Sequence, residues 1–258
     1  AVAFIERNAG KQQPFFLYFA PYSPHSPFDA PDSYLHRFAT VQDLRRRTCL
    51  AMMACVDDSV GRMMDSLAQH QIQSNTLVWY VSDNGAPKNG GGSNKPWSGW
   101  KGNLTDGGIR VPFSVSWPEQ FASQRTYDSM VSTLDVLPTC LSAAGIDELP
   151  RSLDGVNLLP YLAGEKRGAP HKYLYFRWTF GANTQAVIRA SDWKLIQSGQ
   201  RHALYDLAND PEETHEVSES HPVELSELKR RLGEWVSTLP EVSKQRQTRR
   251  RRAVKTNP

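Results

Sequence analysis

Residues 76–112 read TLVWYVSDNGAPKNGGGSNKPWSGWKGNLTDGGIRVP, which is the most informative stretch of the chain. Its apolar start, residues 76–81, predicts a buried strand. The strand stops at Asp83 and Asn84, whose carboxylate and amide oxygens are the donor types that Ca²⁺ or Mg²⁺ prefers. Lys101 follows among glycines and offers a compact ammonium charge suited to a tetrahedral oxyanion. The stretch therefore predicts a strand that delivers a pair of metal ligands, followed by an anion-binding lysine.

A simpler interpretation of Asn84-Gly85 is a type I′ turn between antiparallel strands, because Asn-Gly is the strongest short hairpin signal. The residues that follow, 86–99, show no alternating apolar pattern and are rich in Gly, Asn and Pro. Such a segment does not pair as a return strand. A lone lysine is usually a solvated surface residue, so the interpretation of Lys101 depends on the motif around it.

Apolar runs alternate with helical patterns along the chain, which predicts an α/β fold with a mixed, largely parallel sheet flanked by helices. From about residue 171 the pattern changes and predicts a small antiparallel sheet with one packed helix. Strands are expected at residues 15–20, 76–81, 111–117, 186–197 and 203–207, and helices around residues 50–67, 134–144 and 225–239.

These patterns divide the chain into three parts. Residues 1–170 are expected to be the carboxy-terminal part of a main α/β domain, residues 171–243 a small α+β subdomain, and residues 244–258 a basic disordered tail. Ala1 opens directly on a helical pattern with no initiator Met and no capping residue ahead of it. We therefore expect the amino-terminal part of the main domain to be missing.

The basic character of the chain belongs to its tail. The net charge is +3, yet seven Lys and Arg residues and no acidic residue lie from Lys244 onward. Such a run is most often a solvated end, and the alternative is binding of a polyanion such as a sulfated glycan. No aromatic residue is interleaved with the arginines, as binding of single-stranded nucleic acid would favour, so nucleic acid is not an expected partner.

Composition sets further bounds. No run of about 18 apolar residues exists, so no membrane span is expected. Cys49, Cys55 and Cys140 show no C-x-x-C spacing and lie in apolar helical contexts, which predicts buried thiols. An odd number of cysteines neither proves nor excludes an oxidising compartment. Nothing in the sequence sets the oligomeric state.

A second candidate site residue precedes the metal-ligand pair in the chain. In open α/β sheets the ligand site lies outside the carboxyl ends of the strands, and His25 follows the strand expected at residues 15–20. Prolines on both sides stiffen the loop and hold the imidazole off any helix. His36 lies in a stretch with no such constraint, and the paired Asp57 and Asp58 are interpreted as a polar helix face.

The chain resembles the sulfatase family. The resemblance rests on blocks in the same order: PFFLYFAPYSPHSP, the strand with SDNG, GWKGNLTDGGIRVP, TLDVLPTCLSAAGI with SLDGVNLLPYLAGE, and HALYDLANDPEE. It implies hydrolysis of a sulfate ester, of a carbohydrate or an aryl alcohol, with Ca²⁺ or Mg²⁺ as cofactor. By resemblance, Asp83 and Asn84 would be metal ligands, Lys101 would hold the sulfate oxygens, and His25 would contact the sulfate or assist the departing oxygen. A periplasmic or extracellular location is suggested by the family only.

The nucleophile that the resemblance requires is not in the chain. Such sulfatases use a formylglycine made from a Cys or Ser in a Cys/Ser-x-Pro/Ala-x-Arg motif, whose hydrated form attacks sulfur. None of the three cysteines begins such a motif, so the formylglycine is expected in the missing amino-terminal part and the chain alone is expected to be inactive.

Two other functions stay open. One is a phosphoester or phosphonate hydrolase of the same alkaline-phosphatase-like superfamily, which a plain Thr or Ser nucleophile would distinguish. The other is a non-catalytic protein that binds sulfated glycans in the same pocket. Lys95, Trp97 and Trp100 could line a sugar pocket or only pack the loop.

Overall fold

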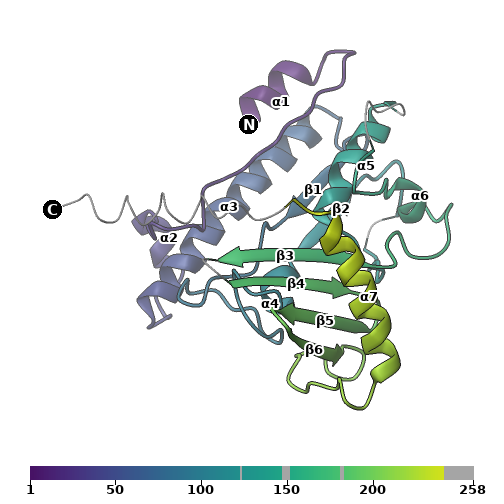
Figure 1. Cartoon of the computed structure of the whole chain (residues 1–258). Coiled ribbons are helices and arrows are strands. Elements are labelled where there is room, and N and C mark those ends of the chain that lie inside the picture. The colour runs from purple at the N-terminus through teal and green to yellow at the C-terminus, as the bar shows by residue number, and fades with distance from the viewer. Residues whose placement is uncertain (123, 147–151, 181–182, 241–258) are drawn as a thin grey trace, which may run out of the picture. The chain divides into compact units, whose positions relative to one another are not determined.

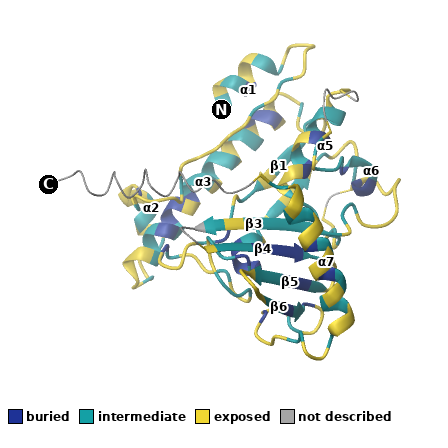
Figure 2. Cartoon of the chain, in the orientation of Figure 1, coloured by how far each residue is buried: buried dark blue, intermediate teal, exposed yellow. Residues whose placement is uncertain are grey.

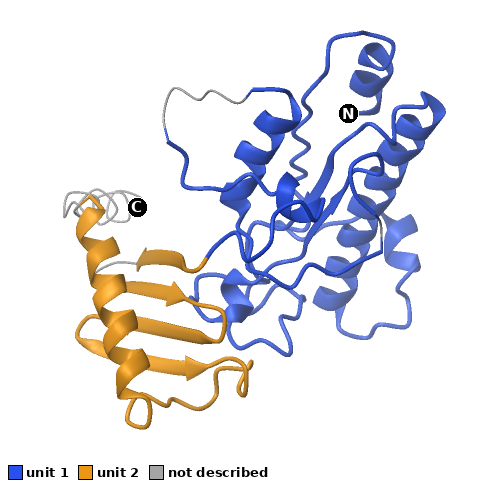
Figure 3. Cartoon of the chain, turned by 90° about the vertical axis from the view of Figure 1, so that its right-hand side faces the viewer, with its two compact units in different colours: residues 1–171 blue, residues 172–258 orange. Residues whose placement is uncertain are grey.

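The computed structural model describes residues 1–122, 124–146, 152–180 and 183–240. The chain divides into two compact units, residues 1–171 and residues 172–258 (Figure 3). Within the described ranges, no helix combines the length and the apolar character that crossing a membrane requires. The basic tail expected at residues 244–258 lies outside the described residues.

Unit 1 combines helices with one short pair of strands (Figure 1). Its elements are α1 (Val2–Asn8), α2 (Asp32–His36), α3 (Leu44–Gln69), β1 (Val78–Val81), α4 (Asp106–Ile109), β2 (Phe113–Ser116), the 3₁₀ helix η1 (Thr133–Asp135), α5 (Val136–Ala143) and α6 (Leu159–Leu162).

The longest element, α3, confirms the helix expected around residues 50–67. It begins where the Asp43 carboxylate accepts a hydrogen bond of 2.7 Å from the Arg46 backbone N–H, as a capping residue does. Both α1 and α2 pack against α3 (Figure 1). Ala51 and Met52 form the buried face toward α2, whereas Met53 is 38% exposed.

The strands expected at residues 76–81 and 111–117 are present as β1 and β2, but the expected parallel sheet is not. In the part of the chain that the structure describes, β1 pairs with β2 in the antiparallel direction, with Trp79 opposite Val115. Parallel neighbours need a crossover, usually a helix, that carries the chain back to the same end of the sheet. The connection here, residues 82–112, is an irregular loop with the single turn α4, and it returns the chain in the opposite direction.

The strand expected at residues 15–20 is also not found. This segment is extended but forms no ladder with any other described residue, and a strand exists only with a hydrogen-bonded neighbour. Its aromatic side chains are correspondingly exposed to solvent: Phe16 is 71% exposed and Tyr18 is 82% exposed. His25 therefore follows an extended segment and not a strand.

The helix expected at residues 134–144 is present as η1 followed by α5. Gly145 ends it with a φ of +74°, a left-handed conformation that glycine adopts without a steric cost. The helix therefore ends near residue 144, as the sequence predicted.

Unit 2 is a small antiparallel sheet with one helix across it, as the sequence predicted (Figure 1). Its described residues form four strands, of which the first in the chain was not expected. The predicted segment at residues 186–197 is two strands joined by a short turn. The elements are β3 (Leu174–Phe180), β4 (Asn183–Arg189), β5 (Trp193–Ser198), β6 (Arg201–Asp206) and α7 (Pro222–Thr238), with the strands in chain order.

The core of unit 2 lies between the sheet and α7. Ile188, Leu195 and Leu204 project from the strands onto Leu228 and Leu232 of α7, and all five are nearly or fully buried. Figure 2 shows the buried parts of β4 and β5 in dark blue. Burying side chains of this size contributes about 1.5 to 3 kcal/mol each. The contact between the sheet and α7 therefore holds the unit together.

A buried ion pair lies on the other face of this sheet. Lys194 neighbours Leu195 in β5, and strand alternation turns it away from α7. Its Nζ is 2.8 Å from a carboxylate oxygen of Glu213, and both side chains are fully buried. Removing one member of a buried ion pair is strongly destabilising, because the attraction that offsets the lost hydration of the other charge is then lost.

We predict that Lys194→Met lowers the free energy of unfolding by about 3 to 5 kcal/mol, because it removes the ammonium group that lies 2.8 Å from the buried Glu213 carboxylate. The double variant Lys194→Met/Glu213→Leu should recover part of this loss. The control is Arg230→Met on the surface of α7, where the lost ion pairs with Glu227 and Glu234 are exposed and the change should be below about 1 kcal/mol. Urea unfolding followed by circular dichroism measures all of these. Equal effects of Lys194→Met and Arg230→Met would contradict the prediction.

Candidate active site

Asp83 and Asn84 lie directly after β1, where the strand gives way to a loop. The Ser82 N–H donates to the Pro112 carbonyl at 3.1 Å, which fixes this strand end to the chain entering β2. Asp83 is exposed and Asn84 is half-buried. The Asn84 Nδ2 donates to the Gly85 carbonyl at 3.0 Å, so the bond uses the nitrogen of the amide and not its oxygen, the atom that would bind a cation.

Three glycines bring two distant stretches of backbone into direct contact beside this pair. The Gly85 N–H donates to the Gly108 carbonyl at 3.0 Å. A Cβ atom on Gly85 would lie 1.8 Å from the Gly107 carbonyl oxygen, one on Gly107 would lie 2.4 Å from the Ser98 oxygen, and one on Gly108 would lie 2.2 Å from the Asn103 oxygen. Any side chain at these positions would push the chain apart, so the glycines set how closely the α4 turn approaches the Asp83-Asn84 pair.

Lys101 is hydrogen-bonded through its backbone to the start of the same loop. Its backbone N–H donates to the carbonyl of Ala86 at 3.1 Å, and Ala86 is two residues beyond Asn84. The Lys101 side chain is exposed. The structure therefore brings the base of Lys101 next to Asp83 and Asn84.

His25 lies on an exposed turn that follows the extended segment. Its backbone N–H donates to the Tyr22 carbonyl at 3.0 Å, and its ring meets the Tyr22 ring edge-on with centroids 5.3 Å apart. The ring Nδ1 is 2.9 Å from the Ser26 carbonyl oxygen. Because a carbonyl can only accept, Nδ1 carries the proton in this contact, and Nε2 is the nitrogen that faces other partners.

The first turn of α3 connects the two loops that carry these residues. The Arg45 guanidinium lies over the Phe28 ring, at 5.2 Å from its centroid, and its Nη1 donates to the Asn89 carbonyl at 2.8 Å. Arg46 Nη1 donates to the Gly91 carbonyl at 2.8 Å. The loop of His25 and the loop of Asp83, Asn84 and Lys101 are thus both fixed to one helix end.

Sequence reasoning missed these arginines, although a signal was present. Arg45, Arg46 and Arg47 stand in the first turn of a helix, where the helix dipole disfavours positive charge. Each of them instead donates to a loop carbonyl, with Arg47 Nε 2.8 Å from the Val41 oxygen. A cationic run at a helix start therefore indicated a role in fixing loops.

The tryptophans of the loop are each covered by a cation. The Arg110 guanidinium lies 4.1 Å from the centroid of Trp97, and the Lys88 ammonium lies 4.7 Å from that of Trp100. Trp97 is half-buried, which fits packing of the loop, whereas Trp100 keeps 39% exposure. Of the two, Trp100 has the surface that a sugar could contact.

The side-chain oxygens of Asp83 and Asn84 are of the type that a hard cation prefers, but they are too few to fill its coordination shell. Asp83 and Asn84 offer two oxygen ligands, whereas Ca²⁺ takes about six to eight. Among the described residues, no group of three or more His, Cys, Asp or Glu side chains could hold a metal ion. Asp58 is already engaged: hydrogen bonds from Tyr34 and Arg37 lower the pKa of its carboxyl group, in keeping with the polar helix face expected there.

The cysteines are free thiols and poor nucleophiles. Cys49 is buried, while Cys55 and Cys140 are partly buried. Burial raises the pKa of all three thiols, and a raised pKa leaves little of the reactive thiolate.

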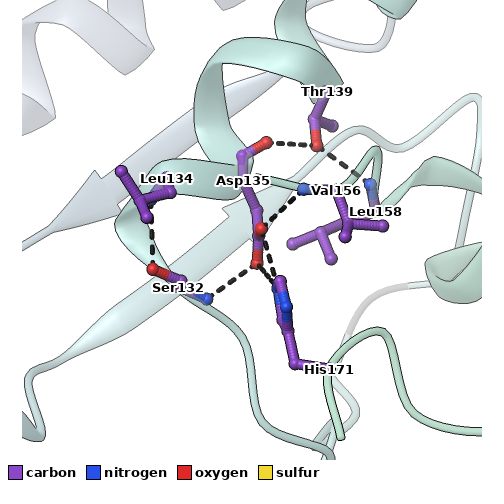
Figure 4. A network of polar contacts seen from close by, with 7 residues as sticks. All are labelled: Ser132, Leu134, Asp135, Thr139, Val156, Leu158 and His171. Atoms are coloured by element: carbon purple, nitrogen blue, oxygen red, sulfur yellow. Dashed lines mark hydrogen bonds and ion pairs between the residues drawn. The ribbon is translucent and has the colours of Figure 1, made fainter. Parts of the chain in front are cut away.

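A second polar network surrounds Asp135, which is fully buried (Figure 4). Its carboxylate accepts from the Ser132 N–H at 2.7 Å and the Val156 N–H at 2.8 Å, and it is 2.8 Å from His171 Nε2. Thr139 bridges the Asp135 carbonyl and the Leu158 N–H. The carboxylate thus joins the start of α5 to the segment before α6.

Ser132, His171 and Asp135 have the residue types of a nucleophilic triad but not its geometry. The Ser132 hydroxyl oxygen accepts from the Leu134 N–H at 3.2 Å, as a helix cap does, and Figure 4 shows it directed away from the His171 ring. A triad needs the serine hydroxyl on the histidine ring. The network is therefore structural, and the spacing Ser132-x-x-Asp135 is the capping-box signal that could have predicted it.

Comparison with known proteins places all four predicted site residues in one family segment. The Sulfatase family model matches residues 1–146, and the model of the N-sulphoglucosamine sulphohydrolase carboxy-terminal region matches residues 99–240. The sulfatase YdeN of Escherichia coli (strain K12) is 36% identical over 224 residues, which is 82% of this chain and 38% of YdeN. The N-acetylgalactosamine-6-sulfatase of Canis lupus familiaris is 33% identical over 77% of this chain and 38% of its own length.

A solved structure shows the same fold. The crystal structure of Ps i-CgsB in complex with k-i-k-neocarrahexaose superposes with a TM-score of 0.85 and 32% identity, covering 91% of this chain and 52% of that protein. The chain thus spans about half of this structure, and 38% of the length of the two curated relatives.

We predict that Gly85→Ala and Gly108→Ala each lower the free energy of unfolding by about 1 to 3 kcal/mol, because the new methyl group meets a backbone oxygen that cannot move alone. The matched control is Gly61→Ala within α3, where nothing lies within 4 Å of the added Cβ. Alanine is the better helix former, so Gly61→Ala should be neutral or stabilising by up to about 1 kcal/mol. Thermal and chemical unfolding of the three variants measure this. A tolerated Gly85→Ala would show that the close approach is not required.

Proposed function

The chain belongs to the sulfatase family, and from this premise we propose that the whole protein hydrolyses sulfate esters of carbohydrates. The observation that carries the proposal is the attachment of Lys101 to the residue two positions beyond Asn84. It joins an anion-binding charge to a pair of oxygen ligands for a cation, within the segment that the family model covers. A site that binds a sulfate group next to a divalent cation needs both a positive charge for the sulfate and oxygen ligands for the cation.

The role of Lys101 follows from its charge and exposure. A flexible, exposed ammonium group can reach the oxygens of a bound sulfate, and it stabilises the negative charge that develops as the S–O bond breaks. A divalent cation held by Asp83 and Asn84 would supply a Lewis acid that draws charge from the same oxygens.

His25 is suited to the departing oxygen. Because Nδ1 donates to the Ser26 carbonyl, a protonated ring presents its second N–H at Nε2. When the ester bond breaks, the electron pair stays on the alcohol oxygen, and Nε2 can give its proton to that oxygen. The ring is then neutral and able to accept a proton in the next turnover.

The substrate class rests on the relatives and on the loop. Relatives act on N-acetylgalactosamine 6-sulfate, by their name, and Ps i-CgsB was crystallised with k-i-k-neocarrahexaose. Between Asp83 and Asp106 the chain has three lysines, two tryptophans and no acidic residue, a composition that suits an anionic sugar.

Non-catalytic binding of sulfated glycans is the second candidate. The observation that favours it is the loop between Asp83 and Asp106, whose lysines and tryptophans could bind an anionic sugar without any covalent chemistry. Turnover of an aryl sulfate or a sulfated sugar by the full-length protein decides between the two functions.

For the full-length protein we predict that Lys101→Ala lowers kcat/KM for a sulfate ester by about 100- to 1000-fold, because a charge that acts in the transition state is lost. The melting temperature should stay unchanged, since an exposed lysine contributes little to the fold. Lys11→Ala, an exposed lysine near the end of α1, is the control and should keep full activity. Unchanged turnover in Lys101→Ala would remove this residue from the mechanism.

We also predict that chelation by EDTA abolishes turnover by the full-length protein and that added Ca²⁺ or Mg²⁺ restores it. Asp83→Ala should raise the cation concentration needed for half-maximal activity by at least about tenfold, because a charged ligand is lost. Asp57→Ala, an exposed aspartate on α3, is the matched control and should leave that concentration unchanged. Full activity after exhaustive chelation would rule out the proposed cation site.

A further inference from the structure

The Asn94 side chain binds the chain on both sides of the loop between Asn84 and Lys101. Its Oδ1 accepts from the Ala86 N–H at 2.7 Å, and its Nδ2 donates to the Ala86 carbonyl at 2.9 Å and to the Gly99 carbonyl at 3.0 Å. Ala86 is two residues after Asn84, and Gly99 is two residues before Lys101. One amide group therefore connects the chain next to the metal-ligand pair with the chain next to the lysine.

The chemistry of these bonds fits only a primary amide of this length. The Ala86 backbone offers an N–H donor and a carbonyl acceptor, and the side-chain amide of Asn94 binds both, with its oxygen and its nitrogen respectively. The second N–H of the amide donates to the Gly99 carbonyl. Aspartate has no donor for the two carbonyls. The Ala86 carbonyl also accepts from the Lys101 N–H at 3.1 Å, so the bonds from Asn94 and Lys101 meet on one oxygen atom.

The loop around Asn94 has no regular structure of its own between residues 82 and 105. Backbone N–H and C=O groups in such a loop must find partners outside a helix or sheet ladder. The side chain of the half-buried Asn94 supplies both hydrogen-bond partners for the backbone of Ala86, as a neighbouring strand would. Its loss would free the segment that carries Lys101 to move relative to Asn84.

We propose that Asn94 is a positioning residue that sets the Lys101 ammonium group relative to the Asp83-Asn84 pair, acting through Ala86 and Gly99 and not by contact with substrate. This rests on the proposed function, since the lysine is the group through which Asn94 acts. Asn94 thus determines whether the anion-binding charge and the cation ligands face one sulfate group together.

The first test is a double-mutant cycle in the full-length protein, with an aryl sulfate as substrate. Asn94→Ala and Asn94→Asp should each lower kcat/KM by about 10- to 100-fold, as loss of a group that orients a site residue does. In the Lys101→Ala background, Asn94→Ala should change kcat/KM by no more than about twofold, because the residue through which it acts is already gone. Asn8→Ala is the control: this half-buried asparagine also donates to a backbone carbonyl, that of Phe4, but lies in α1.

The second test needs no activity. Hydrogen exchange of the Lys101 backbone N–H, measured by NMR or mass spectrometry, should speed up by at least about tenfold in Asn94→Ala and stay unchanged in Asn8→Ala. Lack of turnover by the unsubstituted protein would refute the proposed function alone, and the exchange rate would still report on Asn94. The inference is wrong if exchange at Lys101 is unchanged in Asn94→Ala, or if the losses from Asn94→Ala and Lys101→Ala simply multiply.

Discussion

The candidate site depends on a backbone-to-backbone contact that only glycine permits. Gly85 lies against Gly107 and Gly108, so close that a single methyl group would overlap a carbonyl oxygen. This contact determines where the loop after β1 leaves the strand and where it returns. Asp83, Asn84 and Lys101 are exposed or half-buried and contribute little to the fold themselves, so their arrangement is set by the glycines beneath them.

Side chains, not secondary structure, hold the rest of this loop. Arg45 and Arg46 bind its carbonyls from the first turn of α3, and Asn94 binds it from within. The fully buried carboxylate of Asp135 does similar work near α5, where it accepts backbone N–H groups from two separate segments. In unit 1, polar side chains therefore supply the backbone partners that ladder bonds would provide in a larger sheet.

Local signals in the sequence predicted most elements correctly, because apolar periodicity and Gly145 act within a few residues. The sheet and helix of unit 2 followed from alternation and from the Leu228–Leu232 stripe. The antiparallel pairing of β1 with β2 was missed, since the direction of a strand pair depends on the path of a long irregular loop. The hydrogen bonds of the Asn94 side chain were missed for the same reason. An asparagine in such a loop predicts a turn, whereas the backbone groups that its side chain binds are determined only by the folded loop.

The proposed function requires a cation and an anion-binding lysine to meet at the end of β1. A crystal structure of the full-length protein grown with Ca²⁺ and sulfate tests it most directly. We expect a cation within about 2.3 to 2.6 Å of oxygens from both Asp83 and Asn84. We also expect a sulfate oxygen about 2.7 to 2.9 Å from the Lys101 Nζ. A cation held by other residues, with the sulfate bound away from Lys101, would contradict the account.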